Sequence, residues 1–89
     1  MDPRFKPVIK AMRFRLEQAC GEREQLDELD QLFFDTAAEA GAVVMVLDAK
    51  QKLTGRPLPP SLAAAHARAL KFFEAVLKGL GIFDYAAAN

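Results

Sequence analysis

The 89-residue chain is predicted to be all-α: a three-helix bundle built on a long antiparallel helical hairpin, associating as a homodimer. Sixteen alanines favour helix over strand. Apolar residues recur at alternating spacings of three and four in three segments, which is the helical pattern. A single domain this short, residues 1–89, buries only about 60–65% of its unfolded surface. We therefore expect a second copy or a partner to add buried area.

The first helix is expected over about residues 4–20. Its apolar stripe is Phe5, Ile9, Met12, Leu16 and Ala19. Asp2 and Pro3 are suitable as cap and first position. Pro7 has no N–H and must lie in or near the first turn, so a start at Lys6 is the alternative. Gly21 is the expected stop.

The second helix is expected over about residues 23–52, with Thr54 and Gly55 ending it. Acids fill its first turns and bases its last, the order that the helix dipole favours. Its main stripe is Leu26, Leu29, Phe33, Thr36, Ala40, Val43 and Leu47. The run 43–47 has strand propensity, but no other segment could pair with it. A strand exchanged between two copies is the alternative.

The third helix is expected over about residues 60–79, after a stiff, proline-rich connection at 55–60. Its stripe is Leu62, His66, Ala69, Phe73, Val76 and Leu80. Gly79 and Gly81 mark its end. The segment 80–89 is an apolar tail, and its first half is expected to fold back onto the bundle.

The stripes of the second and third helices match step by step when the two are folded antiparallel. The predicted pairs are Leu47 with Leu62, Val43 with His66, Ala40 with Ala69, Thr36 with Phe73, Phe33 with Val76, and Leu29 with Leu80. Two alanines meeting at the centre would let the backbones approach closely.

The second helix carries a further apolar stripe that one hairpin cannot cover: Phe34, Ala38, Gly41, Met45 and Ala49. We expect the first helix to pack there. The rival is a two-fold dimer in which the second helix meets its own copy through Ala38, Gly41 and Ala42. Both arrangements could coexist, and the sequence does not separate monomer from dimer.

Charge is balanced overall, with 12 bases and 12 acids, but not locally. Residues 1–20 carry five bases and two acids, whereas residues 21–48 carry one base and eight acids. Bases and surplus apolar side chains could bind a partner. The candidate partner-binding residues are Arg4, Lys10, Arg13, Phe14, Phe34, Met45, Val46 and Phe72.

An acidic docking face is predicted on the second helix from Glu24, Glu28, Asp35 and Glu39. Like charges four positions apart repel, and a basic partner would offset that cost. The alternative is an acidic face that is simply solvated. For the bases of the first helix, the alternative is that they pair with the acidic second helix of the same molecule, with Phe14 packing against the tail or a second copy.

No catalytic constellation, metal site or cofactor site is expected, and the chain is predicted not to be an enzyme. His66 is the one histidine and lacks metal-binding companions. It is expected to be a core or interface residue bonded to Thr36, a carbonyl or water. The single Cys20 fits a reducing cytoplasm. No apolar run approaches the roughly 20 residues of a membrane span.

The predicted function is therefore a small non-enzymatic interaction protein, a cytoplasmic regulator or adaptor that binds another protein through apolar and charged helical faces. The alternative is a bacterial or phage accessory protein that binds or packages nucleic acid through the basic first helix. The partner and the pathway are not encoded in any motif of the sequence.

Overall fold

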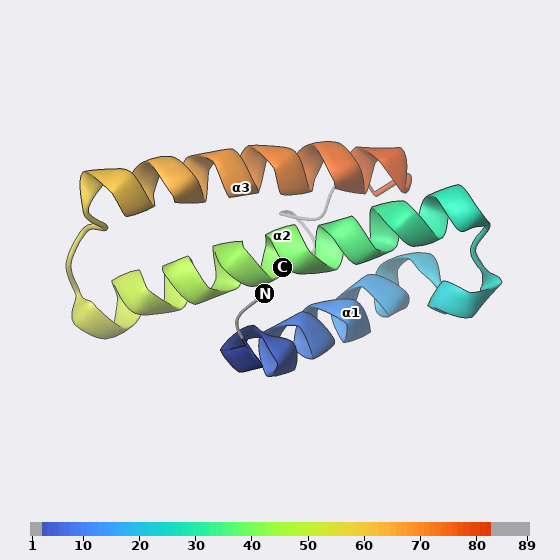
Figure 1. Ribbon diagram of the computed structural model, residues 1–89, viewed down its shortest axis with the longest axis horizontal. Coiled ribbons are helices and arrows are strands. Elements are labelled where there is room, and N and C mark those ends of the chain that lie inside the picture. Colours follow the sequence, from blue (N-terminus) through green and yellow to red (C-terminus); the bar gives the residue numbers. More distant parts are fainter. Residues whose placement is uncertain (1–2, 83–89) are drawn as a thin grey trace.

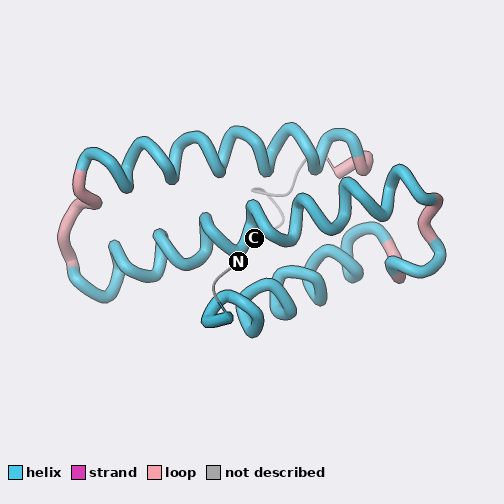
Figure 2. Tube along the Cα trace, in the orientation of Figure 1, coloured by secondary structure: helices cyan, strands magenta, loops and turns pink. Residues whose placement is uncertain are grey.

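A computed structural model describes residues 3–82 and shows three helices packed together, with no strand in that range. Helix α1 spans Lys6–Cys20, α2 spans Glu28–Thr54 and α3 spans Pro60–Gly79 (Figures 1 and 2). The all-α prediction is confirmed. The proposed cap at Asp2 and the apolar tail beyond Ile82 lie outside the described residues.

Helix α1 begins at Lys6, the alternative start that Pro7 predicts. A single 3-10 turn, Pro3–Phe5, leads into Lys6, and Pro7 occupies the first turn, where no backbone N–H is required. The helix ends at Cys20, and the Gly21 N–H donates to the carbonyl of Glu17.

Helix α2 begins five residues later than predicted. Residues Arg23–Gln25 form a separate 3-10 turn, and Leu26 is extended. Asp27 then caps the helix, because its carboxylate accepts a 2.8 Å hydrogen bond from the Asp30 N–H. The acids that follow Gly21 favour a helix that starts at about residue 23. Asp27, the N-cap within that stretch, instead sets the start of α2 at Glu28. The predicted strand-prone run is helical.

A glycine with positive φ follows each of the two helices of the hairpin. Gly55 is left-handed, with φ 65°, and directs the chain out of α2. After α3, Gly81 has φ 83°, and the Ile82 N–H donates to the carbonyl of Leu77 while the Gly81 N–H donates to that of Lys78. This is the Schellman arrangement, and it turns Ile82 back beside the helix.

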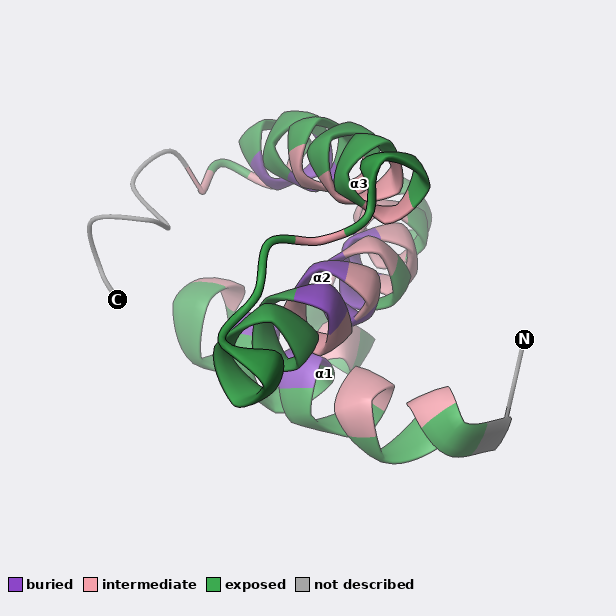
Figure 3. Cartoon of the chain, turned by 90° about the vertical axis from the view of Figure 1, so that its left-hand side faces the viewer, coloured by how far each residue is buried: buried purple, intermediate pink, exposed green. Residues whose placement is uncertain are grey.

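Helix α2 is the central element, and α1 and α3 both pack against it (Figures 1 and 3). The prediction that α1 packs on the second stripe of α2 is confirmed for Phe34, Ala38 and Gly41, whereas Ala49 at the end of the stripe is exposed. The shared core is formed by Met12, Leu16, Phe34, Ala37, Ala38, Phe73, Val76 and Leu77. Ala38, Gly41 and Ala42 are buried in this packing, so on a single chain they do not form the exposed surface that the rival dimer would use.

The antiparallel hairpin is confirmed, but its predicted register is wrong. The Phe33 ring lies against Gly79, about one turn beyond the predicted Val76. Phe73 lies against Gly41 rather than Thr36. His66 bonds to Asp48 rather than facing Val43. The shift is about one helical turn, because α2 continues to Thr54 and places the centre of the connection beyond Gly55.

The main stripe predicted for α2 is consequently only half used. Leu47 is buried and Phe33 packs on the core, but Leu29 is more than half exposed. The buried face of α2 is rotated toward Phe34, Ala38 and Gly41, since two helices, not one, pack on it.

Candidate functional site

A groove of about 740 Å³ runs over α2 between α1 and α3. Most of its walls and floor are apolar. Its lining comprises Met12 and Arg15 of α1, Gly41, Val44, Met45, Asp48 and Lys52 of α2, Leu70, Phe73, Glu74, Leu77 and Lys78 of α3, and Ile82. A concave apolar surface of this size is within the range of ligand sites.

Helical periodicity places these side chains together. Gly41, Met45, Asp48 and Lys52 follow one another at spacings of four, three and four, so they line one side of α2. On α3 the corresponding residues are one or two turns apart. The turn at Gly81 brings Ile82 to the edge of the same groove.

The rim of the groove carries three bases and two acids. The bases are Arg15, Lys52 and Lys78, and the acids are Asp48 and Glu74. Asp48 is already engaged, because its carboxylate lies 2.8 Å from Nε2 of His66. The rim therefore carries one more base than acid.

His66 is half-buried between α3 and α2, where Asp48 is its partner. The expected bond to Thr36 is wrong, since the Thr36 hydroxyl donates instead to the carbonyl of Leu32 at 2.8 Å. In the part of the chain that the structure describes, no three His, Cys, Asp or Glu side chains lie close enough to hold a metal ion.

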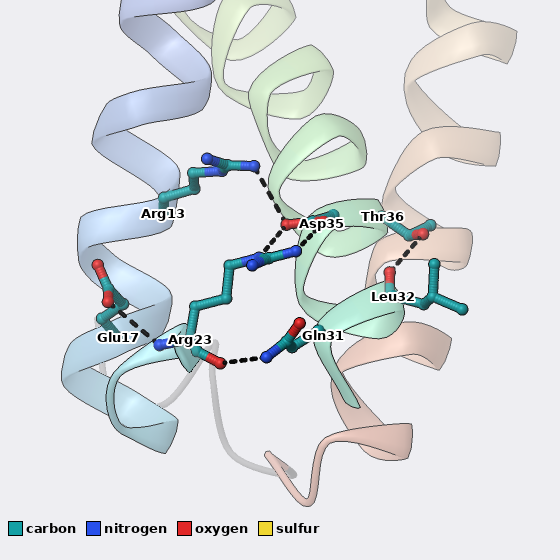
Figure 4. Close-up of polar contacts among 7 residues, drawn as sticks. All are labelled: Arg13, Glu17, Arg23, Gln31, Leu32, Asp35 and Thr36. Atoms are coloured by element: carbon teal, nitrogen blue, oxygen red, sulfur yellow. Dashed lines mark hydrogen bonds and ion pairs between the residues drawn. The ribbon is translucent and has the colours of Figure 1, made fainter. Parts of the chain in front are cut away.

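A polar cluster on the other side of α2 joins α1 to α2 (Figure 4). Arg23 donates two 2.8 Å hydrogen bonds to the Asp35 carboxylate, and Arg13 donates a third at 3.1 Å. Gln31 donates to the Arg23 carbonyl, and the Arg23 N–H donates to Glu17. The cluster fixes the connection between the two helices.

The Arg23 hydrogen bonds hold the pKa of the Asp35 carboxyl below its usual value, and partial burial opposes them. A lowered folded pKa means that the stabilisation is present above the unfolded pKa, about 3.9, and is lost as pH falls through the folded value.

We therefore expect Asp35→Asn to lower the free energy of unfolding by about 1 kcal/mol at pH 7, because the carboxylate is one-third exposed and screened. The difference between the two proteins should shrink below about pH 4. Urea unfolding at pH 7 and pH 3 measures it. A difference that is the same at both values would contradict the role of this carboxylate.

The predicted partner-binding residues do not form one surface. Met45 lines the groove. Val46, the next residue, is half-buried and does not line it. Phe14 and Phe72 are 62% and 54% exposed, but they lie on different helices outside the groove. Phe34 is 1% exposed, so it is a core residue and is not accessible to a partner.

Of the predicted basic residues, Arg4, Lys10 and Arg13 are exposed on or just before α1, and Arg13 contacts Asp35. The intramolecular alternative is thus confirmed for that pair.

Of the predicted acidic docking face, Glu28, Asp35 and Glu39 share one side of α2, because they are seven and four positions apart. Glu24 belongs to the 3-10 turn before α2, and Asp35 is occupied by two arginines. Glu28 and Glu39 are exposed on α2.

Several residues outside the predicted site residues are exposed or line the groove. Leu29, Leu32 and Leu53 are each more than half exposed, and Leu70, Phe73 and Lys78 line the groove. Leu32 and Leu53 lie on neither of the α2 stripes, a signal that could have marked them as surface leucines.

Cys20 is a free, half-buried thiol that donates to the Leu16 carbonyl. Burial raises its pKa, and Asp30 and Glu17 add to the effect, which makes it a weak nucleophile.

Among the described helices, none is both long and apolar enough to cross a bilayer. No protein family, curated protein or solved structure was found to match the chain.

Proposed function

We propose that this protein is a small non-enzymatic interaction module, a regulator or adaptor, whose groove binds one amphipathic helix of another protein. The observation that carries this proposal is the apolar groove between α1 and α3, with α2 as its floor. Apolar side chains recurring along one face of a bound helix would complete a fourth packed helix at this position.

The rim supports a partner helix with acidic margins. Arg15, Lys52 and Lys78 stand at the edges of the groove, and His66 already engages Asp48. Acidic residues flanking the apolar face of the partner would meet these bases. The nucleic-acid alternative is less well supported, because Asp35 already occupies Arg13 of the basic helix.

The test is a selection from a library of helical peptides with randomised faces, followed by titration of the enriched peptides. We expect enriched peptides to have apolar residues spaced three or four apart and more acids than bases. Leu70→Glu, which places a charge on the groove wall, should raise the Kd about tenfold or more, the effect of losing one buried apolar contact.

Leu53→Glu is the matched control, because Leu53 is 87% exposed and lies outside the groove. Its Kd for the enriched peptides should equal that of the unmodified protein. Lys78→Glu should weaken the binding of acidic peptides specifically. An absence of enriched peptides, or equal binding by the Leu70→Glu variant, would reject the groove as the binding site.

Two finer expectations belong to the same proposal. The protein is proposed to be a homodimer, because large apolar side chains remain exposed on a chain of only 89 residues. It is proposed to work in the cytoplasm, with the free thiol of Cys20 as the supporting observation.

A further inference from the structure

A second apolar surface lies on the α2–α3 hairpin, along the edge away from the groove. The contact between Phe33 and Gly79 marks this edge. Leu29 lies four positions before Phe33, and Phe72 lies two helical turns before Gly79, so both lie along the same edge. Leu32 and Thr36 continue it, and Figure 4 shows them on the side of α2 away from Arg13 and Arg23.

We call these residues the outer face: Leu29, Leu32, Thr36, Val43 and Phe72, with the exposed Glu39 between Thr36 and Val43. Leu32 is 64% exposed and Phe72 is 54% exposed, whereas Thr36 and Val43 are half-buried. Single exposed leucines are ordinary, but several along one edge form a patch that water solvates poorly. Each large side chain would gain roughly 1.5–3 kcal/mol by full burial.

The distribution of charge along the molecule indicates which partner would bind the outer face. The molecule is 41 Å long, and its two ends differ in sign. Six acids and one base lie between Glu22 and Asp35, at the end where α2 begins. Lys50, Lys52 and Arg56 lie at the other end, with no acid between them.

Helix α1 adds to this separation. Met12 lies against Gly41, and α1 runs antiparallel to α2, so the basic start of α1 lies beside the second half of α2 (Figure 1). Lys6 and Lys10 are thereby on the side of the basic end. The molecule has an acidic pole and a basic pole at opposite ends of its long axis.

We infer that the outer face is the interface between two copies of this chain, packed antiparallel about a two-fold axis perpendicular to the helices. Only this orientation sets each acidic pole beside the basic pole of the other copy; a parallel pair would bring like poles together. The inference rests on the proposed self-association and assigns its surface and direction. The groove remains open on the other edge.

The first experiment measures solution mass by sedimentation equilibrium over a concentration series. The unmodified protein is expected to dimerise. Leu32→Glu and Phe72→Glu should each raise the dissociation constant about 100-fold, because each buries a charge in the interface. Leu53→Glu and Phe14→Glu are matched controls at exposed apolar residues outside the face, and they should leave the constant unchanged.

The second experiment measures orientation in a Cys20→Ser background, with labels at Gln25→Cys near the acidic pole and Gln51→Cys near the basic pole. Both glutamines are exposed. In mixed dimers the label at position 25 should lie closer to the partner label at position 51 than to one at position 25. The reverse order would overturn the antiparallel arrangement.

The outcomes separate the two proposals. A protein that stays a single chain at every concentration rejects self-association itself. A dimer that the Leu32→Glu variant forms equally well rejects only the outer face. Peptide binding by the Leu32→Glu monomer is read independently, since Leu32 does not line the groove.

Discussion

Replacing Phe34 with alanine is expected to destabilise the fold strongly. Phe34 is 1% exposed and packs among the core residues of α1, α2 and α3. Removing a buried aromatic ring costs about 3–5 kcal/mol, through lost burial and the cavity left behind. Because small domains are stable by only about 5–15 kcal/mol, the variant should be partly unfolded at moderate temperature.

Urea unfolding at one fixed, low protein concentration measures this effect, since dimerisation makes stability depend on concentration. Phe14→Ala is the matched control: the same side chain is removed from a site that is 62% exposed. The control should change the unfolding free energy by less than about 0.5 kcal/mol. Equal losses for the two variants would contradict the placement of Phe34 in the core.

Gly41→Ala is expected to lower stability although alanine is the better helix former. A Cβ at this position would lie 2.8 Å from Cε of Met12 and 2.8 Å from Cε1 of Phe73. The methionine end can move, but the Phe73 ring is buried and cannot easily do so. Overpacking costs about 1–3 kcal/mol, which exceeds the gain in helix propensity of about 1 kcal/mol.

Gly79→Ala tests the same substitution in a looser site. Its Cβ would lie 3.3 Å from the ring of Phe33, which is only half-buried and can shift. Helix propensity should dominate there, so this variant should be as stable as the unmodified protein or slightly more stable. Opposite signs for the two glycines are the expected result, and a stabilising Gly41→Ala would show that α1 and α3 approach α2 less closely.

The helices and their order were predictable because each depends on local signals. The bounds of α3 follow from prolines before it and glycines after it. The packing of α1 on the second stripe of α2 was also predictable, since the hairpin could not cover that stripe. The start of α2 was not, because the capping role of Asp27 competes with a continuous run of helix-favouring acids.

The hairpin register could not be read from the stripes. Apolar residues at spacings of three and four match equally well after a slip of one turn, so the pattern alone does not choose between neighbouring registers. The length of α2 and the connection after Gly55 made the choice and paired Asp48 with His66. The groove was hidden for the same reason, because its walls come from three helices whose relative offsets were unknown.

The sequence by itself determined that the chain is helical and where its helices break, because proline and left-handed glycine act on the backbone within one or two residues. Only the tertiary structure decided which residues of the two apolar stripes of α2 are buried. Both stripes are apolar enough to be buried, and the difference is steric: Gly41 allows Met12 and Phe73 to approach, and this close packing leaves Leu29 of the main stripe outside.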